Sequence, residues 1–209
     1  MNEEQAVLDF FSKQENLPLG LSVATLMDDI RKRMNNDFWQ QLLTSLEASS
    51  HIKESHWLIL TTEDRNDADQ LVGLHFNLNS SQEVYLRPMI EQQFLGGNWR
   101  IYFGLVWSIA PSPEHLKLPA VARLKDALNQ SGLKSNESFL GWQWTNFHPR
   151  RQDFLLRFSA DPQSLLEDAA KPLLSLMSVF SDALAEANAS LHSAPSSKAI
   201  SLDQLRSKR

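Results

Sequence analysis

The spacing of hydrophobic positions predicts helices in the first fifty residues. An apolar cluster at residues 6–11 ends before Pro18, which interrupts helical patterns. We expect a long helix over residues 22–46, with Ser22 as its N-cap. Residues 35–37 read Asn-Asn-Asp and are expected to interrupt this helix, because Asn and Asp favour caps and turns. Its first half has apolar positions spaced as on one helical face, namely Leu26, Met27, Ile30 and Met34.

Alternating hydrophobic and polar positions predict strands in the middle of the chain. The expected strands cover residues 56–62, 71–78, 83–87 and 99–107. Pro88 is expected to end the third strand or to place it at a sheet edge. The segment that follows Pro88, up to the glycines at 96–97, fits either a helical turn or the second part of a hairpin arm. The last strand is almost continuously apolar, which is typical of a central strand covered on both faces.

The last third of the chain combines a second helical pattern with an aromatic hairpin. Residues 111–115 are expected to form a linker, and residues 118–130 a helix closed by Gly132 at the C′ position. Alternation resumes over residues 139–158, which predicts a hairpin with a tip around Pro149. A long helix is expected over residues 162–189, capped by Asp161 and kinked at Pro172. The final residues, 190–209, are polar and predict a flexible tail.

This order of elements predicts the α+β class. We expect a mainly antiparallel sheet of about five or six strands, because strands adjacent in sequence are joined by short polar loops. The sheet is expected to pack with the N-terminal helices, one middle helix and a long C-terminal helix. Residues 1–50 would form a helical segment joined to an α+β domain over residues 51–189, with 190–209 as the tail.

Composition narrows the class of protein. Of the 209 residues, 42% are hydrophobic and 22% charged, which is typical of a globular chain. The net charge of -5 opposes binding to phosphate backbones unless a local basic patch exists. The absence of cysteine excludes disulfides and thiolate chemistry and fits a reducing cytosol. No apolar run is long enough for a membrane span and no signal-peptide pattern is present, so we expect a cytoplasmic protein without membrane contact.

The aromatic hairpin is the first candidate binding surface. Trp142 and Trp144 are two residues apart, so they share one face of a strand. Aromatic rings can stack on bases while arginines hold phosphates, which would make this a nucleic-acid surface. The alternative is that the tryptophans belong to the core and the arginines are solvated. The surface in question comprises Trp142, Trp144, His148, Arg150, Arg151 and Arg157.

Enzymatic chemistry has weaker support. No nucleophile elbow, phosphate-binding glycine loop or HExxH pattern is present. The acidic loop at residues 63–70 departs from the calcium-loop pattern and is expected to be a solvated loop. A metal-dependent hydrolase would require His56 or His75 close to Asp64, Asp67 or Glu83. We expect no cofactor and no resident metal.

The leading prediction is a non-enzymatic protein-interaction or regulatory module that acts in a cytoplasmic complex. The C-terminal helix carries more apolar surface than one sheet covers, so it can extend to a protein partner or to a second copy in a dimer. The tail has the spacing of a short amphipathic helix that orders on binding. The residues expected to face a partner are Phe180, Leu184, Leu191, Ile200, Leu202 and Leu205.

Overall fold

One antiparallel sheet forms the centre of the molecule. The computed structural model describes residues 2–53, 57–95 and 98–194. Its strands pair with their neighbours in the chain, so the order in the sheet is the order in the sequence. They are β1 (Trp57–Thr61), β2 (Val72–Leu78), β3 (Leu86–Leu95), β4 (Asn98–Trp107) and β5 (Phe139–Trp144). This arrangement confirms the expected α+β class with its antiparallel sheet.

The helices come before, between and after the strands. Two precede the sheet together with a short turn of helix: α1 (Glu3–Phe11), α2 (Leu17–Ala48) and α3 (Ser50–Lys53). Two lie between β4 and β5: α4 (Pro113–Lys117) and α5 (Pro119–Gln130). Three follow: α6 (Gln152–Ala160), α7 (Pro162–Val179) and α8 (Ser181–His192). In the described part of the chain, no helix has the length and apolar character needed to cross a membrane.

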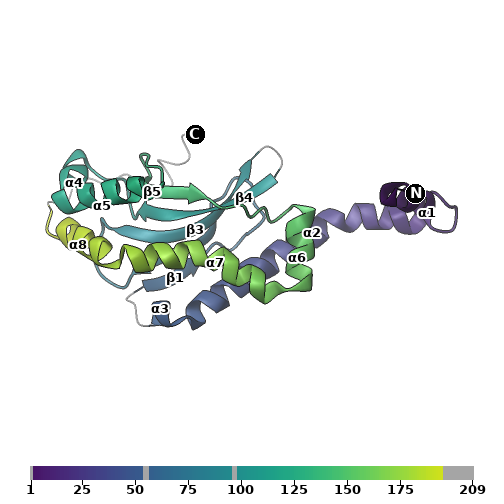
Figure 1. Ribbon diagram of the computed structural model, residues 1–209, viewed down its shortest axis with the longest axis horizontal. Coiled ribbons are helices and arrows are strands. Elements are labelled where there is room, and N and C mark those ends of the chain that lie inside the picture. Colours follow the sequence, from purple (N-terminus) through teal and green to yellow (C-terminus); the bar gives the residue numbers. More distant parts are fainter. Residues whose placement is uncertain (1, 54–56, 96–97, 195–209) are drawn as a thin grey trace.

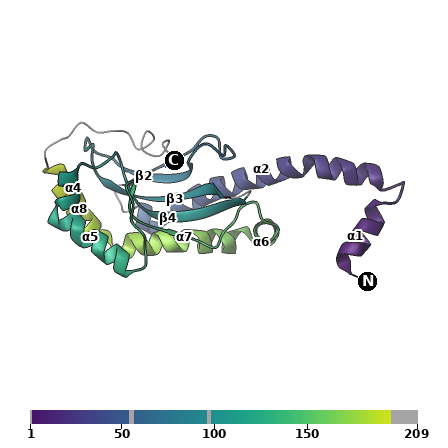
Figure 2. The ribbon, with the colours of Figure 1, turned by 90° about the horizontal axis from the view of Figure 1, so that it is seen from above.

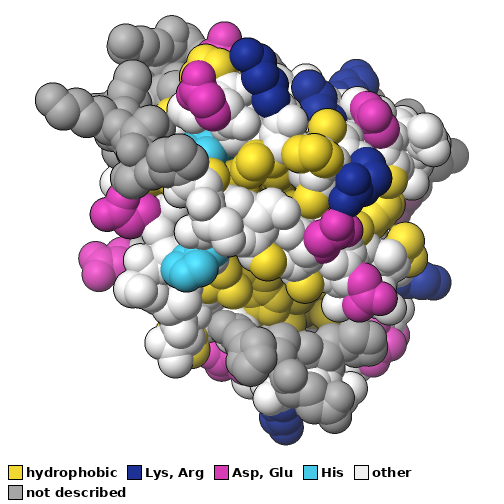
Figure 3. Space-filling model, turned by 90° about the vertical axis from the view of Figure 1, so that its left-hand side faces the viewer, with side chains coloured by type: hydrophobic (Ala, Val, Ile, Leu, Met, Phe, Trp, Pro, Cys, Tyr) yellow, Lys and Arg dark blue, Asp and Glu magenta, His cyan; other side chains and the backbone are white. Residues whose placement is uncertain are grey.

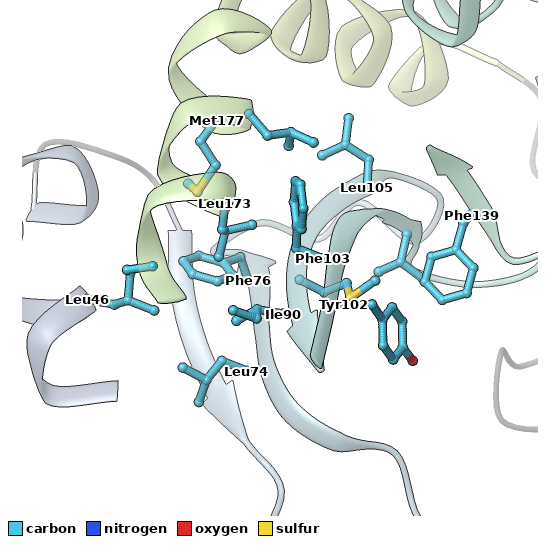
Figure 4. Packing of buried hydrophobic residues seen from close by; sticks show 14 of the residues in the cluster. Leu46, Leu74, Phe76, Ile90, Tyr102, Phe103, Leu105, Phe139, Leu173 and Met177 are labelled. Atoms are coloured by element: carbon cyan, nitrogen blue, oxygen red, sulfur yellow. The ribbon is translucent and has the colours of Figure 1, made fainter. Parts of the chain in front are cut away.

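The second half of α2 and the helices α5, α7 and α8 contact the sheet and form a second layer, whereas α1 and the start of α2 project away from it (Figures 1 and 2). Figure 4 shows Leu173 and Met177 of α7 beside Phe76 and Phe103 of the sheet, all within one apolar cluster. The C-terminal half of α2 lies beside α7 and joins the same core. Tyr102 points away from α7, toward the second face of the sheet. One face of the sheet therefore packs against the helices, whereas the second face carries Tyr102.

The long N-terminal helix starts earlier than its pattern predicts. It begins at Leu17 instead of Ser22, with Pro18 in its first turn. Proline is tolerated there because the first helical N–H groups have no partner within the helix. The expected interruption at residues 35–37 is also wrong, because α2 runs through it. Asn35 is fully buried and bonds to the β1–β2 loop, which gives a polar residue a reason to stand inside a helix.

The third strand is longer than expected. It runs through Pro88 to Leu95, so of the two readings left open for the segment after Pro88 the hairpin arm is correct. Along β3, the pairing with β2 covers Met89 to Gln92, so it starts one residue after Pro88. A proline has no N–H to donate, and here it lies outside the ladder to β2.

The predicted hairpin at residues 139–158 is half strand and half helix. Residues 139–144 form β5, but residues 152–160 form α6 instead of a second strand. Phe154 and Phe158 are buried, whereas Leu156 is 62% exposed. Residues four apart share a face in a helix as well as in a strand, so the two phenylalanines alone fit both periods.

Two further elements differ from expectation. Residues 111–115 are not only a linker, because Ser112 caps α4 and His115 completes a reciprocal capping box. The C-terminal helix continues through Pro172 and is divided at Phe180, which separates α7 from α8. Gly132 follows α5 with a φ of 87°, as expected for a C′ glycine.

Candidate functional site

Among the described residues, exposed large apolar side chains are concentrated at the N-terminal end of the chain. Residues 3–30, comprising α1 and the first half of α2, project from one end of the domain and are called the arm here (Figures 1 and 2). Large apolar side chains on the arm are 37% to 62% exposed. They are Val7, Leu8, Phe10, Leu17, Leu19, Leu21, Val23, Leu26, Met27 and Ile30. Monomeric proteins seldom expose so many large apolar side chains in one segment, which makes the arm the candidate binding site.

The first helix of the arm has little support from the rest of the chain. α1 is nine residues long and contains no buried residue. Its end packs on α2 where Phe11 meets Gly20, a position at which a Cβ atom would lie 2.9 Å from the Phe11 ring. Glycine therefore allows the two helices to approach each other closely. Isolated helices of this length are marginal in water, so α1 needs further contacts to be stable.

The base of the arm is joined to the domain by charge and by a ring contact. The Arg150 guanidinium lies 3.4 Å from the Asp28 carboxylate and 5.8 Å from the centre of the Trp99 ring. The hydrogen bond from Lys32, together with the charge of Arg150, lowers the pKa of Asp28 below its ordinary value, against the opposing effect of desolvation. The arm thus leaves the domain at a defined point.

Aromatic packing holds the next turns of α2. Phe38 is fully buried and makes edge contacts with Trp39, Phe154 and Phe158. The Trp39 indole donates a hydrogen bond of 2.9 Å to the Gln92 side chain in β3. These contacts connect α2 to both α6 and the sheet, so the helix that carries the arm is fixed at its C-terminal half.

The acidic loop between β1 and β2 is docked on α2 instead of being solvated throughout. The Asn35 amide donates to the Arg65 carbonyl oxygen at 2.6 Å and to Asn66 at 3.2 Å. The Arg65 side chain donates in turn to the carbonyl of Asn36 and to Gln40. Partial burial lowers the pKa of Arg65 from its ordinary value. The loop therefore stabilises α2 directly beneath the arm.

The tryptophans of the predicted aromatic surface lie on the second face of the sheet. Trp142 and Trp144 contact each other at 5.4 Å between ring centres, and both contact Tyr102. The Arg100 guanidinium lies 5.3 Å from the centre of the Trp144 ring. Both tryptophans are partly buried against the core, so they are in part structural.

The arginines expected to accompany these tryptophans are each placed beside a carboxylate. Arg150 pairs with Asp28, as described, and contacts Trp99 instead of Trp142 or Trp144. Arg151 pairs with Asp153 and Arg157 with Asp168. His148 lies 3.2 Å from the Trp99 carbonyl oxygen through its Nδ1 atom. The structure therefore does not bring the three arginines and the two tryptophans together as one surface.

A buried carboxylate marks the same face of the sheet. Glu91 is fully buried, lies 2.6 Å from the His75 Nε2 atom and accepts a hydrogen bond from the Tyr102 hydroxyl. The hydrolase reading required His75 near Asp64, Asp67 or Glu83, whereas the structure pairs it with Glu91. The Asp64 and Asp67 carboxylates instead accept backbone N–H groups of their own loop. His56 lies outside the described residues.

The partner-facing residues expected on the C-terminal helix are mostly in the core. Leu184 and Leu191 are 4% and 3% exposed and belong to the apolar cluster, and Phe180 packs against it. Ile200, Leu202 and Leu205 lie outside the described residues. In the described part of the chain, exposed apolar side chains gather instead at the N-terminal end, where Leu26 and Ile30 of the predicted helical stripe belong to the arm.

The end of the molecule opposite the arm has a different character. Figure 3 shows hydrophobic patches there that lie between side chains of both charges. Within the described ranges, no group of three or more His, Asp or Glu side chains is placed to hold a metal ion.

No family model, no curated protein and no solved structure matches this chain.

Proposed function

We propose that this chain is a non-enzymatic protein-interaction module of a cytoplasmic complex and that the arm is its docking element. The observation that carries this proposal is the set of ten large apolar residues, each 37% to 62% exposed, on α1 and on the first half of α2, a helix that the domain holds at its other end. The absence of cysteine supports the cytoplasmic setting. The domain would act as the support from which the arm is presented.

The exposed surface is large enough to support association. About half of each apolar side chain on the arm is in solvent, which corresponds to roughly five fully exposed side chains, each worth about 1.5–3 kcal/mol on burial. The gross gain is then roughly 7–15 kcal/mol, against an association penalty of about 4–15 kcal/mol. A stable complex therefore requires a partner that covers both α1 and the first half of α2.

Photo-crosslinking tests this proposal. A benzoylphenylalanine placed at Leu26, 53% exposed on the arm, should give discrete adducts in cells that make the protein. The matched control is the same probe at Val179, 74% exposed at the end of α7, which should give far weaker adducts. Equal labelling from both positions, or none from Leu26, would refute the arm as the docking element.

A further inference from the structure

The arm carries an apolar stripe with the spacing of a helix that pairs with another helix. Leu19, Val23, Leu26 and Ile30 follow at intervals of four, three and four residues, as in the seam of a coiled coil. These side chains are between 38% and 56% exposed. Met34, one turn further, packs against the core of the domain. The stripe is thus the outward continuation of a face that the domain already buries.

The two ends of the arm carry opposite charges. α1 contains Glu3, Glu4 and Asp9 and no basic residue. Residues 28–33, at the base of the arm, contain Asp28, Asp29, Arg31, Lys32 and Arg33, so they carry a net charge of +1 against -3 on α1. Asp28 pairs with Lys32 and Arg150. In the part of the chain that the structure describes, Glu3, Glu4, Asp9, Arg31 and Arg33 form no ion pair with another residue, so these side chains are available to a partner.

We infer that the occupant of the arm is the arm of a second copy of this chain, paired antiparallel. This inference rests on the proposed function, because it names the partner of the same surface. A two-fold axis near residues 24–25 sets Leu19 of one copy against Ile30 of the other, and Val23 against Leu26. The seam between the outer two residues is about 17 Å long at the rise of an α-helix.

Charge and shape both favour the antiparallel direction. It brings the acidic α1 of each copy to the Arg31 and Arg33 end of the other copy. A parallel pair would set α1 against α1 and place like charges together, which is unfavourable. Because the arm projects from one end of the domain (Figure 1), the antiparallel pair also leaves the two domains at opposite ends.

Sedimentation equilibrium of the full chain tests the second copy as the partner. Between about 1 and 100 µM we expect a reversible monomer–dimer equilibrium, with a Kd in the micromolar range. The double variant Leu19→Gln and Leu26→Gln keeps good helix formers in place and should raise the Kd at least about tenfold. The control Leu156→Gln changes an equally exposed leucine on α6 and should leave the Kd unchanged.

Charge exchange tests the direction. Arg31→Glu with Arg33→Glu should weaken self-association, and Glu3→Lys with Glu4→Lys should do the same. A parallel pair already opposes like charges at both ends, so in that arrangement either double variant would leave the Kd nearly unchanged. The variant with all four substitutions exchanges the two charges, so in the antiparallel pair its Kd should return toward that of the wild type. Dimerisation of the wild type that neither double variant weakens would overturn the antiparallel arrangement.

A wild-type chain that stays monomeric at about 100 µM would overturn the second copy as the occupant. The crosslinking experiment then separates the two proposals. Adducts of the Leu26 probe with a different protein would leave the arm as a docking element for that protein. Absence of Leu26 adducts in a monomeric chain would overturn both proposals.

Discussion

Replacing Phe38 by alanine should separate the part of α2 that belongs to the fold from the part that forms the arm. Phe38 is fully buried and makes edge contacts with Phe154 and Phe158. Truncation of such a side chain costs about 3–5 kcal/mol, because the apolar burial is lost and a cavity remains. For a chain of 209 residues this corresponds to a fall in Tm of roughly 6–20 °C. The matched change on the arm, Leu21→Ala, should stay within about 0.5 kcal/mol, because that side chain is 62% exposed.

Urea unfolding followed by tryptophan fluorescence measures both free energies. The protein concentration should be low enough to keep the chain monomeric, so that association through the arm does not contribute. If Leu21→Ala lowers the free energy of unfolding by more than about 1 kcal/mol, the arm packs on its own domain and Leu21 is not exposed as described. A loss below about 1 kcal/mol for Phe38→Ala would refute its place in the core.

Three other changes test the sheet, the base of the arm and the buried carboxylate. Gly104→Ala should destabilise the chain by about 1–3 kcal/mol or more in thermal unfolding, because its Cβ would collide with the backbone of β5. The hydrogen bond from Lys32 lowers the pKa of Asp28 in the folded protein, so this pairing stabilises the base of the arm above about pH 4 and is lost as the pH falls through the lowered pKa. Carboxyl NMR titration should therefore place the Asp28 midpoint below that of an unstructured Asp, and an ordinary midpoint would contradict the geometry. Tyr102→Phe removes a donor to the buried Glu91 and should lower the unfolding free energy by about 1.5–3 kcal/mol in urea, whereas an unchanged value would contradict that bond.

Most of the sheet could be predicted from the sequence because its strands obey a simple period. In β2, Val72, Leu74 and Phe76 are buried at alternate positions, as the pattern indicates. The strand predicted over residues 99–107 is buried almost throughout, because β4 lies between β3 and β5 and helices cover one of its faces. These assignments depend on local spacing alone.

The remaining differences between the predicted and the observed elements arise where a contact between residues distant in the sequence determines the local structure. Asn35 is a poor helix residue by propensity, yet it lies inside α2 because its amide reaches the β1–β2 loop thirty residues later. Phe154 and Phe158 fit a strand or a helix equally well by spacing, and their packing on Phe38 selects the helix. The arm was missed for a related reason. Its apolar positions match those of a buried helix, and nothing in the local pattern shows that the domain leaves them uncovered.

The order of the elements in the chain has a consequence for biosynthesis. Strands that pair with their immediate neighbours close short loops, so the sheet can form while the polypeptide is still being elongated. α2 is made before α7, against which it packs, and more than a hundred residues separate the two helices in the chain. Throughout that interval the side of α2 that faces α7 stays uncovered. Until α7 is made, the nascent chain therefore exposes an apolar surface that a chaperone could protect.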